Sequence, residues 1–118
     1  ATEFVAGFIG DINKLSGKVT SQNELVCNGQ NIIANTKNIA IGKDVKMFFR
    51  PENIFITESN NGIHGKIMQS VFAGTHTKLE VELKDGNIVH INQTVNHIHK
   101  QGDEIYLEIK QNTAIVFE

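Results

Sequence analysis

The chain has 118 residues, of which 40% are apolar, and its formal net charge at pH 7 is −2. This length fits one typical domain, and no apolar run approaches the roughly 18 residues that a membrane-spanning helix needs. Lys and Arg are scattered, which argues against a nucleic-acid partner because such a partner requires a clustered basic face. The single cysteine, Cys27, cannot form an internal disulfide and favours a reducing compartment.

The first residues predict a short helix. Phe4, Val5, Phe8 and Ile9 form one apolar stripe at helical spacing, and Gly10 is a suitable stop. A helix of one or two turns is marginal alone, so this one must dock on another element. No signal-peptide pattern is present. The chain lacks an initiator Met and begins in mid-pattern, so we expect a fragment of a longer protein.

From residue 14 onward the pattern alternates with a period of two, which is typical of strands. The candidate strands cover residues 15–21, 24–28, 31–34, 45–50, 53–57, 64–72, 77–84, 87–93, 104–110 and 114–117. Asn28-Gly29 and Asp85-Gly86 each separate two such runs and predict hairpins with type I′ turns. The polar stretch 59–62 is the best internal boundary.

The one proline lies between two apolar runs. Arg50-Pro51-Glu52 separates the alternating run 45–49 from Ile54 and Ile56. Proline lacks the N–H that a sheet requires, so Pro51 ends the first strand and forms a rigid corner. The corner presents a cation and an anion, but nothing in the sequence makes this pair catalytic.

The two sides of the boundary resemble each other. Gly17-Lys18-Val19 matches Gly65-Lys66-Ile67, Asn28-Gly29 matches Asp85-Gly86, and the runs 42–45 and 102–105 match in turn. Each copy holds about five short strands with glycine at the corners, which is typical of a small Greek-key barrel of the OB type. We therefore predict an all-β fold of two tandem OB-like barrels, over residues 14–58 and 59–118, preceded by the helical segment 1–13. Each copy is small, so the copies should share one core or exchange strands.

Histidine offers two candidate sites. His97 and His99 would lie on one face of a strand, as a metal pair does, but no further ligands are evident and solvated histidines are the simpler reading. Gly74, Thr75 and His76 form a loop inserted in the second copy. Their backbone N–H groups, hydroxyl and imidazole suit an anion or regulatory site, with an ordinary polar turn as the alternative.

Catalytic signals are weak throughout the chain. Cys27, Ser16 and Ser21 have no His or acidic partner of the triad kind nearby in sequence. No phosphate-binding loop is present. Phe48 and Phe72 are the candidate stacking residues of a nucleic-acid site, but Trp is absent and the charge is slightly acidic. We expect no catalytic residue, metal or cofactor in this chain.

Three motifs in order resemble one family: Phe4-Val-Ala-Gly-Phe-Ile-Gly10 followed by Asn13, then Arg50-Pro51-Glu52, then the run from Gly65 through Gly74-x-His76-Thr77 to Asp85-Gly86. The chain resembles the C-terminal regulatory region, of the transport-associated OB (TOBE) type, of the ATP-binding subunits of bacterial ABC importers. It is most similar to the spermidine/putrescine importers, with iron, sulfate and sugar importers as the alternatives.

The resemblance implies a non-catalytic regulatory and dimerisation domain. The catalytic residues, ATP and Mg would belong to a missing nucleotide-binding domain, to which residues 1–13 would be the linker. The whole subunit would be a homodimer that binds membrane permease subunits through that domain, on the cytoplasmic face of the membrane. Asn13, Arg50, Pro51 and Glu52 match the family pattern as structural residues. Two other functions remain open: a small-ligand sensor in the cleft near Gly74-Thr75-His76, and a nucleic-acid-binding or His97/His99 module.

Overall fold

The computed structural model describes residues 12–94 and 99–118, and almost all of the regular secondary structure in them is β-strand. The strands are β1 Asn13–Ser21, β2 Glu24–Cys27, β3 Gln30–Ile33, β4 Asp44–Phe49, β5 Ile54–Thr57, β6 Ile63–Ala73, β7 His76–Leu83, β8 Ile88–Thr94, β9 Glu104–Ile109 and β10 Ile115–Phe117, with one short 3-10 helix, η2, at Pro51–Asn53. The all-β prediction is confirmed, and each expected strand is present. The helix predicted over residues 4–10 lies outside the described residues.

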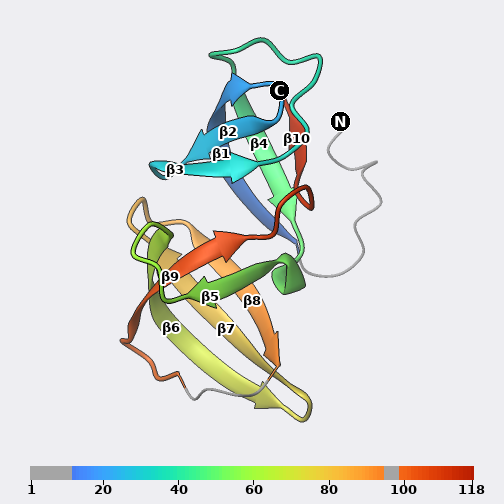
Figure 1. The fold of residues 1–118 in the computed structure, drawn as a ribbon. Coiled ribbons are helices and arrows are strands. Elements are labelled where there is room, and N and C mark those ends of the chain that lie inside the picture. The colour runs from blue at the N-terminus through green and yellow to red at the C-terminus, as the bar shows by residue number, and fades with distance from the viewer. Residues whose placement is uncertain (1–11, 95–98) are drawn as a thin grey trace.

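The strands form two antiparallel sheets (Figure 1). The first has the order β10-β4-β1-β2-β3 and the second the order β5-β9-β6-β7-β8. In both sheets the fourth strand of a copy returns beside the first, which is the Greek-key arrangement. The predicted ranges 14–58 and 59–118 therefore each supply four consecutive strands of one sheet.

The fifth strands are exchanged between the sheets. β5 leaves the first copy and pairs with β9 of the second sheet, whereas β10 leaves the second copy and pairs with β4 of the first. In Figure 1 the C-terminal strand β10 accordingly lies beside β4, although the two strands are far apart in the sequence. Strand exchange was one of the two expected ways for the copies to associate, and the structure has it in reciprocal form.

Hydrogen bonds confirm the internal duplication. Val19 N donates to Lys43 O at 3.0 Å, and Gly42 N donates to Val19 O at 2.8 Å. The matching bonds of the second copy are Ile67 N to Asp103 O at 2.9 Å and Gly102 N to Ile67 O at 2.7 Å. Gly42 and Gly102 both have a positive φ, of 92° and 94°, which explains glycine at both positions.

Two further matched glycines are fixed by close packing. A Cβ at Gly17 would lie 2.7 Å from Val26 O, and a Cβ at Gly65 would lie 2.4 Å from Val81 Cγ1. No side chain fits at such distances unless the Val26 main chain or the Val81 side chain moves. The glycine of the Gly-Lys-(Val/Ile) repeat therefore marks a position where the first strand of each copy packs closely against the second, its antiparallel neighbour.

The two predicted hairpins have different turns. Asn28 and Gly29 both have a positive φ, of 50° and 78°, as a type I′ turn requires. The type I′ prediction is wrong for Asp85-Gly86, because only Gly86 has a positive φ and Gly86 N donates to Leu83 O in a three-residue loop. The Asp85 carboxylate accepts hydrogen bonds from the main-chain N and the Nδ2 of Asn87, both at 3.0 Å, and this holds the chain in the longer loop.

One hydrophobic core joins both sheets. Its members include Leu15, Met47 and Phe49 from the first sheet and Ile67 and Leu107 from the second. These side chains are at most 1% exposed. The shared core was the other expected form of association, so the two copies both exchange strands and bury a common interior.

Candidate functional site

A side-chain amide joins the two sheets at one seam. Asn13, the first residue of β1, donates from Nδ2 to His90 O at 2.8 Å and accepts from His90 N at Oδ1 at 2.7 Å. The Asn13 side chain thus satisfies the outward main-chain groups of β8, an edge strand of the second sheet. Asn13 is only 2% exposed, so this pair is shielded from water. We call this contact the closed seam, and it gives the sequence-predicted Asn13 a structural role.

The duplication defines a second seam at the equivalent place. The offset that matches Gly17 with Gly65 also matches Asn13 with Asn61, and the offset that matches Gly29 with Gly86 matches Ile33 with His90. Asn61 is exposed, its main-chain N donates to Ser59 Oγ, and its side chain makes no hydrogen bond to any residue that the structure describes. We call the region between Asn61, β3 and β9 the open seam. Sequence reasoning missed it, although the repeat of asparagine at the same register was a usable signal.

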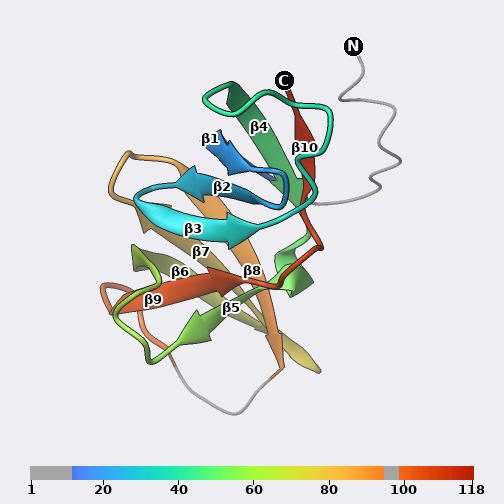
Figure 2. The same ribbon diagram turned by 45° about the horizontal axis from the view of Figure 1, so that its top comes forward.

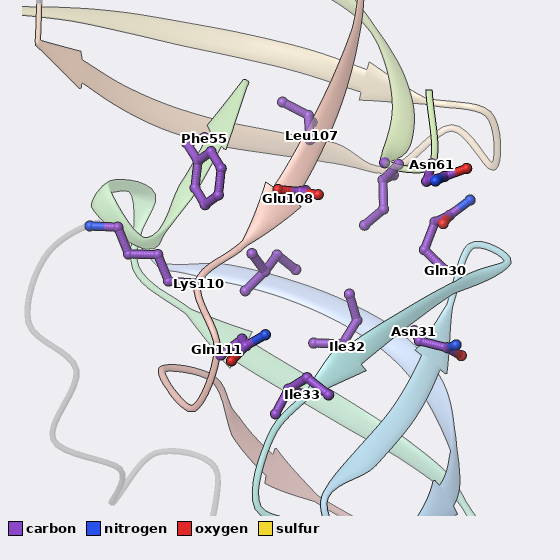
Figure 3. Close-up of a pocket in the computed structure, with 13 residues that line it drawn as sticks. Gln30, Asn31, Ile32, Ile33, Phe55, Asn61, Leu107, Glu108, Lys110 and Gln111 are labelled. Atoms are coloured by element: carbon purple, nitrogen blue, oxygen red, sulfur yellow. The ribbon is translucent and has the colours of Figure 1, made fainter. Parts of the chain in front are cut away.

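The open seam contains a cavity of about 470 Å³ (Figure 3). All four residues of β3 line it, together with Asn61 and the end of β9, and Figure 2 shows β3 and β9 adjacent where the two sheets meet. Its lining residues are Gln30, Asn31, Ile32, Ile33, Phe55, Asn61, Gly62, Ile63, Leu107, Glu108, Ile109, Lys110 and Gln111. Gln30 and Asn61 lie at one end of the cavity and Lys110 at the other (Figure 3).

The predicted ligand loop lies on the hairpin between β6 and β7. Gly74 and Thr75 form a two-residue turn with a φ of 80° at Gly74, and all three residues 74–76 are exposed. Thr75 Oγ1 and His76 Nδ1 are 2.8 Å apart and share a hydrogen bond. This loop does not line the open seam, and its role as an anion or regulatory site stays a prediction.

The structure brings His76 close to the proline corner. His76, Glu52, Asn92, Thr94 and Lys110 together line an open hollow of about 490 Å³. Two groups that sequence reasoning singled out separately therefore share one surface. The hollow holds a carboxylate, an amine and an imidazole with no buried charged group among them.

The proline corner is the crossing point between the sheets. Pro51 is buried and starts η2, whose Asn53 N donates to Arg50 O at 2.9 Å. Asn53 O then accepts from Lys110 N at 2.8 Å. The corner carries the chain from β4 in the first sheet to β5 in the second, and η2 packs on β8. Arg50 is half-buried and Glu52 is exposed.

Within residues 12–94 and 99–118, no three His, Cys, Asp or Glu side chains cluster in a way that could hold a metal ion. His64 Nε2 lies 2.9 Å from Glu104 Oε1, and His90 Nδ1 lies 3.9 Å from Glu80 Oε1. His97 is outside the described residues, so the proposed His97/His99 pair stays untested. Burial raises the pKa of the Cys27 thiol to about 12, with a smaller contribution from Asp85, so this thiol is protonated and unreactive at neutral pH.

The described part of the chain has no helix that is long and apolar enough to cross a membrane.

Comparison with known proteins identifies a family pattern. The pattern of the TOBE domain matches residues 47–117. The chain is 32% identical over 108 residues to the spermidine/putrescine import ATP-binding protein PotA of Clostridium acetobutylicum, and the alignment covers 91% of the chain and 30% of that protein. It is 33% identical over 122 aligned positions to the Fe(3+) ions import ATP-binding protein FbpC of Fusobacterium nucleatum, and this alignment covers 99% of the chain and 33% of that protein. The chain thus spans about a third of the length of these relatives.

A solved structure shares the fold. The cytoplasmic molybdate-binding protein ModG matches with a TM-score of 0.73 at 14% identity, over 88% of this chain and 94% of that one. At this identity the match concerns the arrangement of the strands alone. The prediction of paired OB-like barrels is confirmed by it.

Proposed function

Because the chain belongs to the TOBE domain family, we propose that it is the non-catalytic regulatory and dimerisation region of an ABC importer ATP-binding subunit, and that the importer takes up spermidine and putrescine. The observation that carries this proposal is the similarity to PotA over 91% of the chain. The interlocked sheets support it, because reciprocal strand exchange joins the two copies into one unit.

In this proposal the ATP, the Mg and the catalytic residues belong to a nucleotide-binding domain that precedes the present residues. That domain binds the membrane permease subunits on the cytoplasmic face of the membrane. Two copies of the subunit associate about a two-fold axis, so each presents the same self-complementary patch to the other. The chain itself only holds and regulates this assembly.

An uptake assay tests the transported substrate. Deletion of the gene that encodes the chain should abolish uptake of radiolabelled spermidine, and the intact gene should restore it. Loss of ferric-iron uptake with unchanged spermidine uptake would refute the polyamine proposal. That outcome would support the second candidate, an iron importer, which the similarity to FbpC over 99% of the chain favours.

A second assay tests the regulatory role. The purified 118-residue chain should not hydrolyse ATP. The whole subunit should hydrolyse ATP with or without these residues, but its dimer should dissociate more readily when they are removed. Measurable hydrolysis by the chain alone, or an unchanged dimer in sedimentation, would contradict the proposal.

A further inference from the structure

The two seams are equivalent in sequence register but differ in how the edge strand is satisfied. At the closed seam the Asn13 amide gives one donor and one acceptor to the main chain of His90. At the open seam Asn61 holds the equivalent position without reaching the main chain of Ile33. A cavity of about 470 Å³ separates them. The fold therefore leaves one of two matched seams unfilled.

Main-chain groups of β3 point into this space. Asn112 N donates to Ile33 O at 2.9 Å, so the main chain of Ile33 faces away from β2. Alternate residues of a strand direct their main-chain groups to the same side, so Asn31 faces the same way. Ile33 N–H and both main-chain groups of Asn31 have no partner among the described residues. Three hydrogen-bonding positions are thus free along the edge of β3.

The cavity walls suit a peptide. Carboxamides, which match the donors and acceptors of peptide groups, come from Gln30, Asn31, Asn61 and Gln111. Phe55, at 39% exposure, and the half-buried Ile33 offer apolar contacts for side chains of an incoming strand, whereas Ile32, Leu107 and Ile109 belong to the core. Glu108 and Lys110 supply one charge of each sign, so the site has no net preference for a free anion or cation.

We propose that the open seam binds an extended peptide segment of a partner protein, which adds as a strand to the edge of β3. The peptide groups of the segment bond to the main chain of Asn31 and Ile33. They take the place that the Asn13 side-chain amide holds beside the main chain of His90 at the closed seam. This inference is read from the two seams alone and is independent of the proposed transport role. A second copy of the chain at the same edge is the competing occupant.

Amide hydrogen exchange of the full 118-residue chain tests the proposal. The probe is the blocked pentapeptide acetyl-Thr-Asn-Val-Asn-Thr-amide, at about 5 mM because a few net main-chain hydrogen bonds give a Kd on the order of 1 mM. The amides of Asn31 and Ile33 should become protected and shift in the NMR spectrum. The amide of His90 should remain protected by Asn13 with and without the peptide. The same peptide N-methylated at alternate residues should have no effect.

A matched pair of proline variants places the site. Asn31→Pro removes an N–H that faces the seam and breaks no bond to β2, and edge strands tolerate proline. It should weaken peptide binding at least roughly tenfold. Ile88→Pro makes the same change at the equivalent edge position of β8, and should change binding less than about twofold.

Three outcomes would overturn the proposal. The first is that the exchange rates and NMR shifts of the Asn31 and Ile33 amides do not change when the peptide is added in excess. The second is that the N-methylated peptide binds as tightly as the unmodified peptide. The third is protection of these amides that rises with protein concentration in the absence of peptide, which would assign the edge to a second copy. If Asn31→Pro does not fold, the exchange data on the unaltered chain still decide.

Discussion

Asn13 is the residue on which the contact between the sheets most depends. Its replacement by Ala removes both hydrogen bonds to His90 and leaves the part-buried main-chain N–H and C=O of that residue without their protein partner. Such a loss costs about 2–4 kcal/mol of unfolding free energy. Urea denaturation should therefore show a lower midpoint for Asn13→Ala.

Asn61→Ala is the control for this prediction, because Asn61 is exposed and its side chain holds no hydrogen bond within residues 12–94 and 99–118. Its unfolding free energy should change by less than about 0.5 kcal/mol. Equal losses for both variants would mean that the two seams contribute alike, contrary to the structure.

Cys27 sets a pH dependence with a defined sign. The pKa of its buried thiol is about 12 in the folded chain, against an ordinary value of 9.0. Above pH 9 the unfolded chain loses this proton and the folded chain keeps it, so the unfolded state binds fewer protons and stability falls as pH rises. The contribution is fully present below pH 9 and is lost between pH 9 and 12.

The measurement is the difference in unfolding free energy between the unaltered chain and Cys27→Ala at pH 8, 9, 10 and 11. Cys27→Ala should be the less stable variant at pH 8, because it leaves a gap in the core. The difference should shrink by up to about 1.4 kcal/mol per pH unit above the unfolded pKa. A difference that stays constant with pH would contradict the raised pKa.

At the scale of elements, the exchanged strands carry the connection between the copies. A chain that ends at residue 113 lacks β10, so β4 loses its outer partner and Phe48 loses the edge-to-face contact with Phe117 at 5.7 Å. The unfolding free energy should fall by about 3 kcal/mol or more, because several apolar side chains leave the sheet.

Hydrogen exchange locates that effect. Protection should fall in β4 before it falls in β9, since β9 keeps its partner β5. Removal of Glu118 alone deletes only a surface ion pair with Lys43 at 3.7 Å and serves as the control. A truncated chain with an unchanged urea midpoint would show that β10 does not stabilise the first sheet.

The strands themselves could be predicted from the sequence, but their partners could not. Alternation along 45–49 and the break at Pro51 placed β4, β5 and the corner between them correctly, because those signals are local, although the corner was not predicted to be a 3-10 helix. Nothing local says that β5 pairs with β9 rather than with a strand of its own copy. The turn at Asp85-Gly86 was mispredicted because the Asp85 carboxylate binds Asn87 and stabilises a three-residue loop.

The candidate site was less accessible to sequence reasoning. Asn13 could be singled out by family resemblance, but its partner is a main-chain group 77 residues away. The open seam exists because the matched residues Asn13 and Asn61 make different contacts. The Asn13 side chain bonds the main chain of the other sheet, whereas Asn61 bonds Ser59 through its own main-chain N. That difference depends on how the second sheet packs against the first, and no local sequence pattern predicts this packing.

At the scale of the whole molecule, the exchanged strands and the common core predict that the sheets unfold together. Val19 and Ile67 report on this, because they are equivalent residues in different sheets. Each donates its amide across its own sheet, to Lys43 O at 3.0 Å and to Asp103 O at 2.9 Å. In native-state exchange at increasing urea, both amides should show the same opening free energy and the same urea dependence, those of global unfolding.

Independent barrels would give a different result. If each copy unfolded alone, one of these two amides would exchange through a smaller opening, with a lower urea dependence because less surface is exposed. The structure opposes this, because unfolding one sheet would strip the fifth strand from the other and expose the apolar side chains that both bury. A clear separation of the two opening free energies would therefore contradict the exchange of β5 and β10 as the element that unites the molecule.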